Sequence, residues 1–318
     1  MTLWERALAT YPQWREHLVA LDDLTTRMRD LGPAVVDIAA DMGPPIASRV
    51  ADPDTAPGGV YGYGLWSARG EQARPALFVQ PGLAPAGAAP ASITSAGRMI
   101  ERMQAAVPAE TVAVALPPPQ LQRASTRGSS VAPGMSVTIG SRRATLGLRV
   151  LAPDAAGPRR AILTAGHAAP VPGVIVRDEA GDLVGTVLSA TSLGNAGQGV
   201  SIADVAVVAI DDRRTEADDE VGDHVDAAQP HDVVRIARSD STAPILGLCP
   251  AFALKQGLGS WGHVAITAAA ISRDGDSGAP VHRADGAVIG QIVAGYGSAY
   301  SLVQDAEYVM REAGVFLR

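Results

Sequence analysis

The spacing of apolar residues divides the chain into a helical beginning, a mixed middle and a long final part with the pattern of short strands. Over residues 2–31 apolar side chains recur every three or four positions, which predicts two helices that meet near Pro12. Gly32-Pro33 ends the second helix, and we expect a helical segment over residues 1–42. Its apolar stripe, which carries two tryptophans, either packs within a helical hairpin or docks on a partner protein.

The middle of the chain is predicted to form a small α/β module over residues 59–117. A stretch rich in Pro, Gly and Ala over 43–58 precedes it and is typical of a linker. The predicted order is β-β-α-β, with strands at Val60–Trp66, Ala76–Val79 and Thr111–Leu116 and a helix at Ser92–Ala106. Residues 118–132 are polar and without periodicity, so we expect a second linker and the main domain boundary there.

The final part, residues 133–318, has strand-like runs separated by turn signals, as in an all-β barrel or sandwich. The predicted strands are Met135–Ile139, Ala144–Leu151, Arg160–Thr164, Val174–Arg177, Leu183–Leu188, Val205–Ile210, Val233–Ala237, Val264–Ala270 and Ala287–Val293. A helix is predicted over Val303–Ala313, ended by Gly314. One helix closing an otherwise β domain is the expected shape.

Composition narrows the classes of function. The 318 residues favour two domains, and a net charge of −7 without a basic stretch argues against nucleic acid or anionic membranes as partners. The chain has no apolar run of about 20 residues, so no membrane span is expected. Cys249 is the sole cysteine, which excludes an intrachain disulfide, and the start lacks a signal-peptide pattern. We therefore expect a cytoplasmic protein, and its Ala- and Arg-rich composition with one lysine is compatible with a bacterial source.

Candidate chemistry centres on Gly275-Asp-Ser-Gly-Ala-Pro280. A serine hydroxyl is a poor nucleophile until a base takes its proton and donors hold the oxyanion that forms. Gly275 permits a sharp turn that aims the N–H groups of Gly275 and Ser277 at one spot. The same residues also make a good tight turn between strands, so the interpretation depends on partners upstream.

Two upstream residues suit those partner roles. His167 directly follows the apolar run Ala161–Leu163 and a small-residue turn, which places it at a strand end. Asp204 opens the apolar strand Asp204–Ile210, so its carboxylate will be partly buried and needs a partner. The imidazole of His167 can be that partner, although Asp204 is also a common type of residue at the start of a strand.

Together, Thr164-Ala-Gly-His167, Asp204-Val-Ala-Val and Gly275–Pro280 resemble the three signatures of the chymotrypsin/trypsin-like serine protease family. The resemblance covers about residues 133–318, and the three motifs occur in the family's order. More weakly, the chain with its preceding module also resembles disulfide-free bacterial trypsin-like peptidases.

The resemblance implies a double β-barrel with the active site between the barrels. Ser277 would attack a peptide carbonyl, His167 would act as general base and then general acid, and Asp204 would orient His167. The amides of Gly275 and Ser277 would form the oxyanion hole. No metal or organic cofactor is implied.

The chain departs from the family pattern before the first barrel. It has no Ile/Val-Val/Ile-Gly-Gly start to the protease domain, so a newly cut N-terminus is not expected to insert beside Asp276. We expect an arginine to pair with Asp276 instead, with Arg142, Arg143 and Arg235 as candidates.

The second departure concerns the pocket for the residue that precedes the cut. The resemblance places Ile271 at its base, where an Asp would select Lys or Arg. With Ala294, Gly295 and Tyr296 as a wall, we expect a preference for apolar or small side chains.

The leading hypothesis is therefore an intracellular serine endopeptidase that acts on protein or peptide substrates. Its N-terminal region would gate it or bind a regulatory protein partner, as in a bacterial defence or signalling effector. The alternatives are a protease-fold scaffold or binding protein without turnover, an ester hydrolase, or a protease that cleaves its own linker at Pro117–Ser130.

Overall fold

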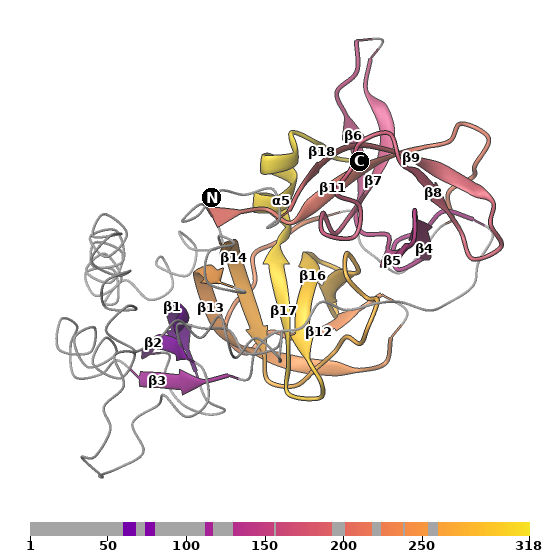
Figure 1. The fold of residues 1–318 in the computed structure, drawn as a ribbon. Coiled ribbons are helices and arrows are strands. Elements are labelled where there is room, and N and C mark those ends of the chain that lie inside the picture. The colour runs from indigo at the N-terminus through magenta and orange to yellow at the C-terminus, as the bar shows by residue number, and fades with distance from the viewer. Residues whose placement is uncertain are drawn as a thin grey trace, which may run out of the picture.

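The computed structural model describes residues 60–67, 74–79, 112–116, 130–155, 157–192, 201–217, 224–237, 239–253 and 260–318. The predicted helices within 1–42 and at Ser92–Ala106, and most of the predicted linker 118–132, lie outside these residues. The described part is mainly β, and the predicted double β-barrel with a C-terminal helix is confirmed. In Figure 1 the two barrels lie one above the other, and the helix lies beside their junction.

The first barrel is an eight-stranded sheet in the order β18-β6-β7-β11-β9-β8-β4-β5. Its strands are β4 (Ser136–Ile139), β5 (Arg142–Thr145), β6 (Arg149–Ala152), β7 (Arg159–Thr164), β8 (Ile175–Arg177), β9 (Leu183–Thr191), β11 (Val205–Ile210) and β18 (Phe316–Leu317). The residues after β5 close the sheet, because Leu146 N–H donates to the Met135 carbonyl and Gly147 N–H to the Leu163 carbonyl. Branched and small side chains such as those of Ile162, Val176 and Val208 fill one core cluster of this barrel.

The second barrel is a closed ring in which β12-β13-β14-β17-β16-β15 pair in turn and β15 returns to β12. Its strands are β12 (Val233–Ile236), β13 (Thr242–Ala253), β14 (Ser260–Thr267), β15 (Pro280–Arg283), β16 (Val288–Tyr296) and β17 (Tyr300–Asp305). The two-residue strand β10 (Ser201–Ile202) adds to β14 in parallel. Closure leaves few free strand edges, as expected for a stable antiparallel barrel.

The C-terminal helix α5 spans Ala306–Ala313, three residues shorter than predicted. The predicted start at Val303 was wrong because Val303 and Gln304 belong to β17. The helix begins where the Asp305 carboxylate accepts a hydrogen bond from Tyr308 N–H at 2.7 Å. It ends at Gly314, whose φ of 66° is left-handed, as predicted.

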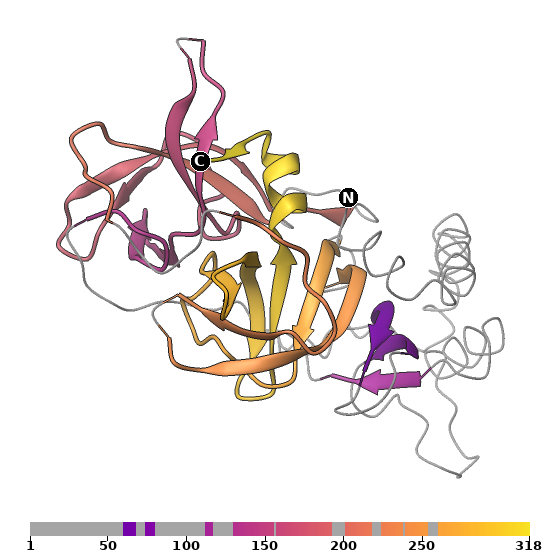
Figure 2. The same ribbon diagram turned by 180° about the vertical axis from the view of Figure 1, so that it is seen from behind.

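Strands of the predicted accessory module extend the sheet of the second barrel. They are β1 (Val60–Trp66), β2 (Arg74–Val79) and β3 (Val112–Ala115), and these three strand predictions are confirmed. β1 pairs antiparallel with β13, β2 with β1, and β3 lies parallel to β2. Figures 1 and 2 show the three strands at the side of the second barrel. The domain boundaries of the chain stay predictions.

Candidate active site

The structure brings His167, Asp204 and Ser277 together where the two barrels meet. His167 follows β7 and Asp204 precedes β11, both in the first barrel, while Ser277 lies before β15 in the second. The Oδ2 atom of Asp204 is 2.6 Å from His167 Nδ1, and His167 Nε2 is 3.1 Å from Ser277 Oγ. Asp204 and Ser277 are fully buried, whereas the His167 side chain is 17% exposed. The three side chains thus form one hydrogen-bonded line that reaches solvent at the imidazole.

Asp204 holds His167 by two hydrogen bonds rather than one. Besides the contact at Nδ1, the backbone N–H of His167 donates to Asp204 Oδ1 at 2.7 Å. Because the carboxylate accepts at Nδ1, that ring nitrogen carries the proton and Nε2 presents a lone pair to Ser277. The ring is therefore fixed in both orientation and tautomer.

Two buried glutamines of the second barrel form hydrogen bonds with the backbone of Asp204. Gln304 Oε1 accepts from Asp204 N–H and Gln291 Nε2 donates to the Asp204 carbonyl, both at 2.8 Å. Gln304 Nε2 also donates to the carbonyls of Ile202 and Gly262. The glutamines face each other as a cross-strand pair on β16 and β17. Sequence reasoning missed them, although a polar residue in an apolar strand is itself a signal, because once buried it must find partners.

The loop that carries Ser277 is hydrogen-bonded to Thr145 of the first barrel. The Thr145 hydroxyl donates to the Gly275 carbonyl at 2.8 Å, and Thr145 N–H donates to the Ser277 carbonyl at 3.0 Å. Gly275 has a φ of 99°, a conformation that side chains disfavour, so the glycine predicted for the turn is needed. The assignment of the Gly275 and Ser277 amides to an oxyanion hole stays a prediction.

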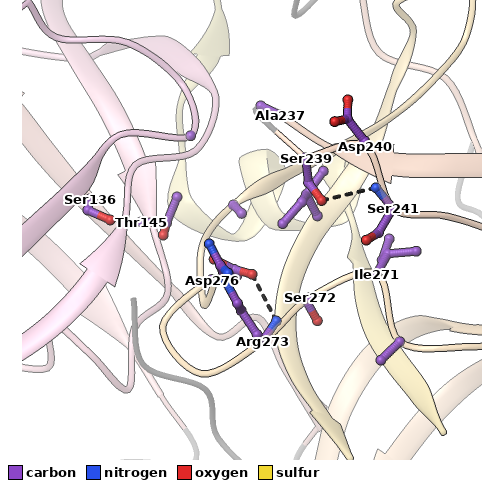
Figure 3. Close-up of a pocket in the computed structure, with 14 residues that line it drawn as sticks. Ser136, Thr145, Ala237, Ser239, Asp240, Ser241, Ile271, Ser272, Arg273 and Asp276 are labelled. Carbon is purple, nitrogen blue, oxygen red and sulfur yellow. Dashed lines mark hydrogen bonds between the residues drawn. The ribbon is translucent and has the colours of Figure 1, made fainter. Parts of the chain in front are cut away.

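The expected partner of Asp276 was wrong. Among the described residues no arginine forms an ion pair with it, and Arg142 instead donates to the His167 carbonyl. Asp276 accepts from the backbone N–H of Arg273 at 2.8 Å (Figure 3). Burial raises the pKa of its carboxyl above the ordinary value, and the hydrogen bond and positive charge of Arg273 oppose this only in part.

Asp276 borders a cavity of about 400 Å³ behind the Ser277 loop. Ser136 and Thr145 of the first barrel line one side of it, and Ser239 and Ile271 of the second barrel line others (Figure 3). Hydroxyls and Asp276 make this lining largely polar. The cavity could not be predicted from the sequence, because its lining combines residues of both barrels that are far apart in the chain.

The predicted pocket residues lie together around β17. Ile271 N–H donates to Ser301 Oγ at 3.1 Å, and Ser301 pairs directly with Gly295. Ile271 and Ala294 are buried, and Tyr296 is partly buried. The proposed base and wall of the pocket therefore meet at Ser301, while their role in substrate selection stays a prediction.

The described residues hold no cluster of metal-ligating side chains and no membrane-spanning helix. They contain no group of three or more His, Cys, Asp or Glu side chains placed to hold a metal ion. None of their helices is long and apolar enough to cross a membrane. The line Asp204–His167–Ser277 can move a proton from a hydroxyl to an imidazole, which is the chemistry of nucleophilic acyl transfer.

Comparison with known proteins gives structural likenesses only. No family model and no curated protein matches the sequence. A glutamic-acid-specific serine protease has a TM-score of 0.47 at 18% identity, covering 59% of this chain and all of its own. Protease A of Thermobifida fusca has a TM-score of 0.47 at 19% identity, covering 59% of this chain and 98% of its own. The MamO protease domain of Magnetospirillum magneticum has a TM-score of 0.39 at 16% identity, covering 56% and 95%.

All three are proteases. Because their TM-scores are below 0.5, the function proposed below rests on the residues of this chain and their geometry.

Proposed function

We propose that this chain is an intracellular serine endopeptidase that hydrolyses peptide bonds through an acyl-enzyme. The observation that carries the proposal is the hydrogen-bonded line from the Asp204 carboxylate through His167 to Ser277 Oγ. The single cysteine, which allows no intrachain disulfide, supports the intracellular setting.

The proposed reaction begins with proton transfer from Ser277 Oγ to His167 Nε2, across the 3.1 Å contact. The oxygen attacks the peptide carbonyl, and the Asp204 carboxylate stabilises the imidazolium that forms. His167 then gives the proton to the leaving amine, and the acyl group stays on Ser277. A water molecule, deprotonated by His167, attacks the acyl-enzyme and releases the second product.

The proposed substrate is a protein or peptide with an apolar or small residue before the cut. Ile271 supplies no charge at the base of the pocket, so a basic side chain would lose its hydration without gaining a partner there. The proposal includes regulation by the residues that precede the barrels or by a partner protein.

Labelling with a fluorophosphonate and intact-mass spectrometry tests the proposal. The reagent forms a covalent bond to an activated serine, so wild type should gain one adduct while Ser277→Ala gains none. His167→Ala should also remain unlabelled, although its serine is present, because the base is lost. Heat-denatured wild type serves as the control for nonspecific reaction.

A folded wild-type protein that remains unlabelled would contradict the proposal and would favour a function in binding or as a scaffold. Equal labelling of wild type and His167→Ala would show that the reagent does not report an activated serine. Circular dichroism of each sample establishes that the variants are folded.

A further inference from the structure

The accessory strands make a fitted contact with the second barrel. β1 pairs with β13, and the aromatic rings of Trp66 and Phe78 lie over Gly247 in the middle of that strand. A Cβ atom on Gly247 would lie 3.1 Å from Trp66 Cε3 and 3.2 Å from Phe78 Cζ. The rings contact each other edge to face, and Phe78 also packs against Phe252 with ring centres 6.2 Å apart. Gly247 thus leaves the space that the two rings fill.

A single row of directly paired residues joins this contact to the predicted pocket wall. Gly247 on β13 pairs with Ile266 on β14, Ile266 with Leu302 on β17, and Leu302 with Ala294 on β16. Directly paired residues share one face of a sheet, with their Cβ atoms about 4.5–5.5 Å apart. Ile266, Leu302 and Ala294 are fully buried and belong to the same core cluster as Phe78 and Trp66.

The row crosses β17 at the point where that strand also holds the pocket base. Leu302 lies in the row, and its neighbour Ser301 accepts hydrogen bonds from the N–H groups of Ile271 and Ser272. Because protein interiors are close-packed, a shift at one end of a buried row is passed to its neighbours. A displacement of β17 would therefore move the base and the wall together.

We propose that Trp66 and Phe78 are positioning residues for the substrate pocket, and that docking of the accessory strands on β13 sets how well the pocket accepts a side chain. The proposal rests on the serine endopeptidase function given above. It makes β1–β3 part of the substrate-binding apparatus rather than a separable attachment. A ligand or partner that loosened these strands would lower selectivity for substrate although it contacts none of His167, Asp204 and Ser277.

The test compares two probes that react with the same serine. One is a small fluorophosphonate without a side chain for the pocket, and the other is a peptidyl diphenyl phosphonate with valine at the pocket position. The ratio of their second-order rate constants, peptidyl over small, reports the pocket and is independent of the folded fraction and of serine activation.

Two variants disturb the contact from opposite sides. Gly247→Val adds bulk beneath the rings, and Phe78→Leu, the milder change, removes a ring. Phe316→Leu is the matched control, because Phe316 is exposed on β18 of the first barrel. Val176→Ala, within the separate core of that barrel, controls for general loosening.

We expect both contact variants to lower the ratio by about tenfold, the lower end of what one methylene is worth in an apolar pocket. Both controls should keep the wild-type ratio. An unchanged ratio in Phe78→Leu would overturn the inference, as would an equal fall in Val176→Ala. If neither probe labels wild type, the endopeptidase function itself fails, which is a different result from an unchanged ratio.

Discussion

Replacing Gln304 by methionine should lower the stability of the protein more than the same replacement at Gln291. The side chain is fully buried, and its three hydrogen bonds go to Asp204 N–H and to the carbonyls of Ile202 and Gly262. A buried bond contributes about 1 kcal/mol net, and a partner left unpaired costs about 1–3 kcal/mol. Three partners left unpaired together predict a decrease of about 3–9 kcal/mol in the free energy of unfolding.

The matched control is Gln291→Met on the neighbouring strand. Gln291 is buried to a similar degree and faces Gln304, but it donates one hydrogen bond, to the Asp204 carbonyl. Its replacement leaves one partner unpaired and should cost about 1–3 kcal/mol. Urea unfolding followed by tryptophan fluorescence measures both losses, since Trp261 is fully buried in the second barrel.

The same substitution should also slow the labelling of Ser277 in the folded protein. Without Gln304, the peptide of Asp204 is free to shift, and an error of about 1 Å in a catalytic group can cost a hundredfold in rate. A Gln304→Met protein as stable as Gln291→Met would refute the reasoning. So would a folded Gln304→Met that labels at the wild-type rate, because the glutamine would then not position Asp204.

Two further predictions concern the loop around Ser277. Gly278→Ala should destabilise the protein and abolish the labelling of Ser277. The φ of Gly278 is 92°, and a Cβ atom there would lie 2.7 Å from Ala165 N. The strained backbone alone should lower the free energy of unfolding by about 1–3 kcal/mol. Gly297→Ala is its control, since Gly297 also has a positive φ but open space, and equal losses of melting temperature would show that the inter-barrel contact is unimportant. For Asp276, the raised pKa means that the folded state binds the proton more tightly than the unfolded state does. The melting temperature of wild type minus that of Asp276→Asn should therefore fall as pH rises from the ordinary value of 3.8 through the raised pKa. Parallel curves for the two proteins would contradict the assignment.

The candidate site was predictable because its three motifs are short and each is local. His167 follows an apolar strand, Asp204 precedes one, and Ser277 lies shortly before β15, so strand ends place all three at the junction of the barrels. The partner of Asp276 was not predictable in this way. It depends on the fold of a loop, where Arg273 donates its backbone N–H to the carboxylate and adds a nearby positive charge.

β13 is a strand that sequence reasoning missed because its residues are untypical of strands. β13 contains Pro244, Gly247 and Pro250, which argue against a strand. Its register against β1 shifts so that Cys249 and Pro250 lie opposite Gly64, and a bulge of this kind tolerates the missing N–H of Pro250. The glycine is explained by the two rings that pack on it. Gly247 and Pro250 thus both mark places where β13 is fitted to β1.

β17 shows most clearly why a helical interpretation of its sequence failed. Its end, Val303–Gln304, joins the apolar spacing of α5 and so extends the apparent helix period. Yet β17 carries Ser301 beneath the pocket base, Leu302 in the row to the accessory strands and Gln304 against Asp204. A helix would turn these three side chains away from their partners, whereas a strand presents Leu302 and Gln304 on one face and Ser301 on the other. The pocket, the accessory strands and Asp204 therefore depend on one strand, so a change in its position should alter substrate selection and serine activation together.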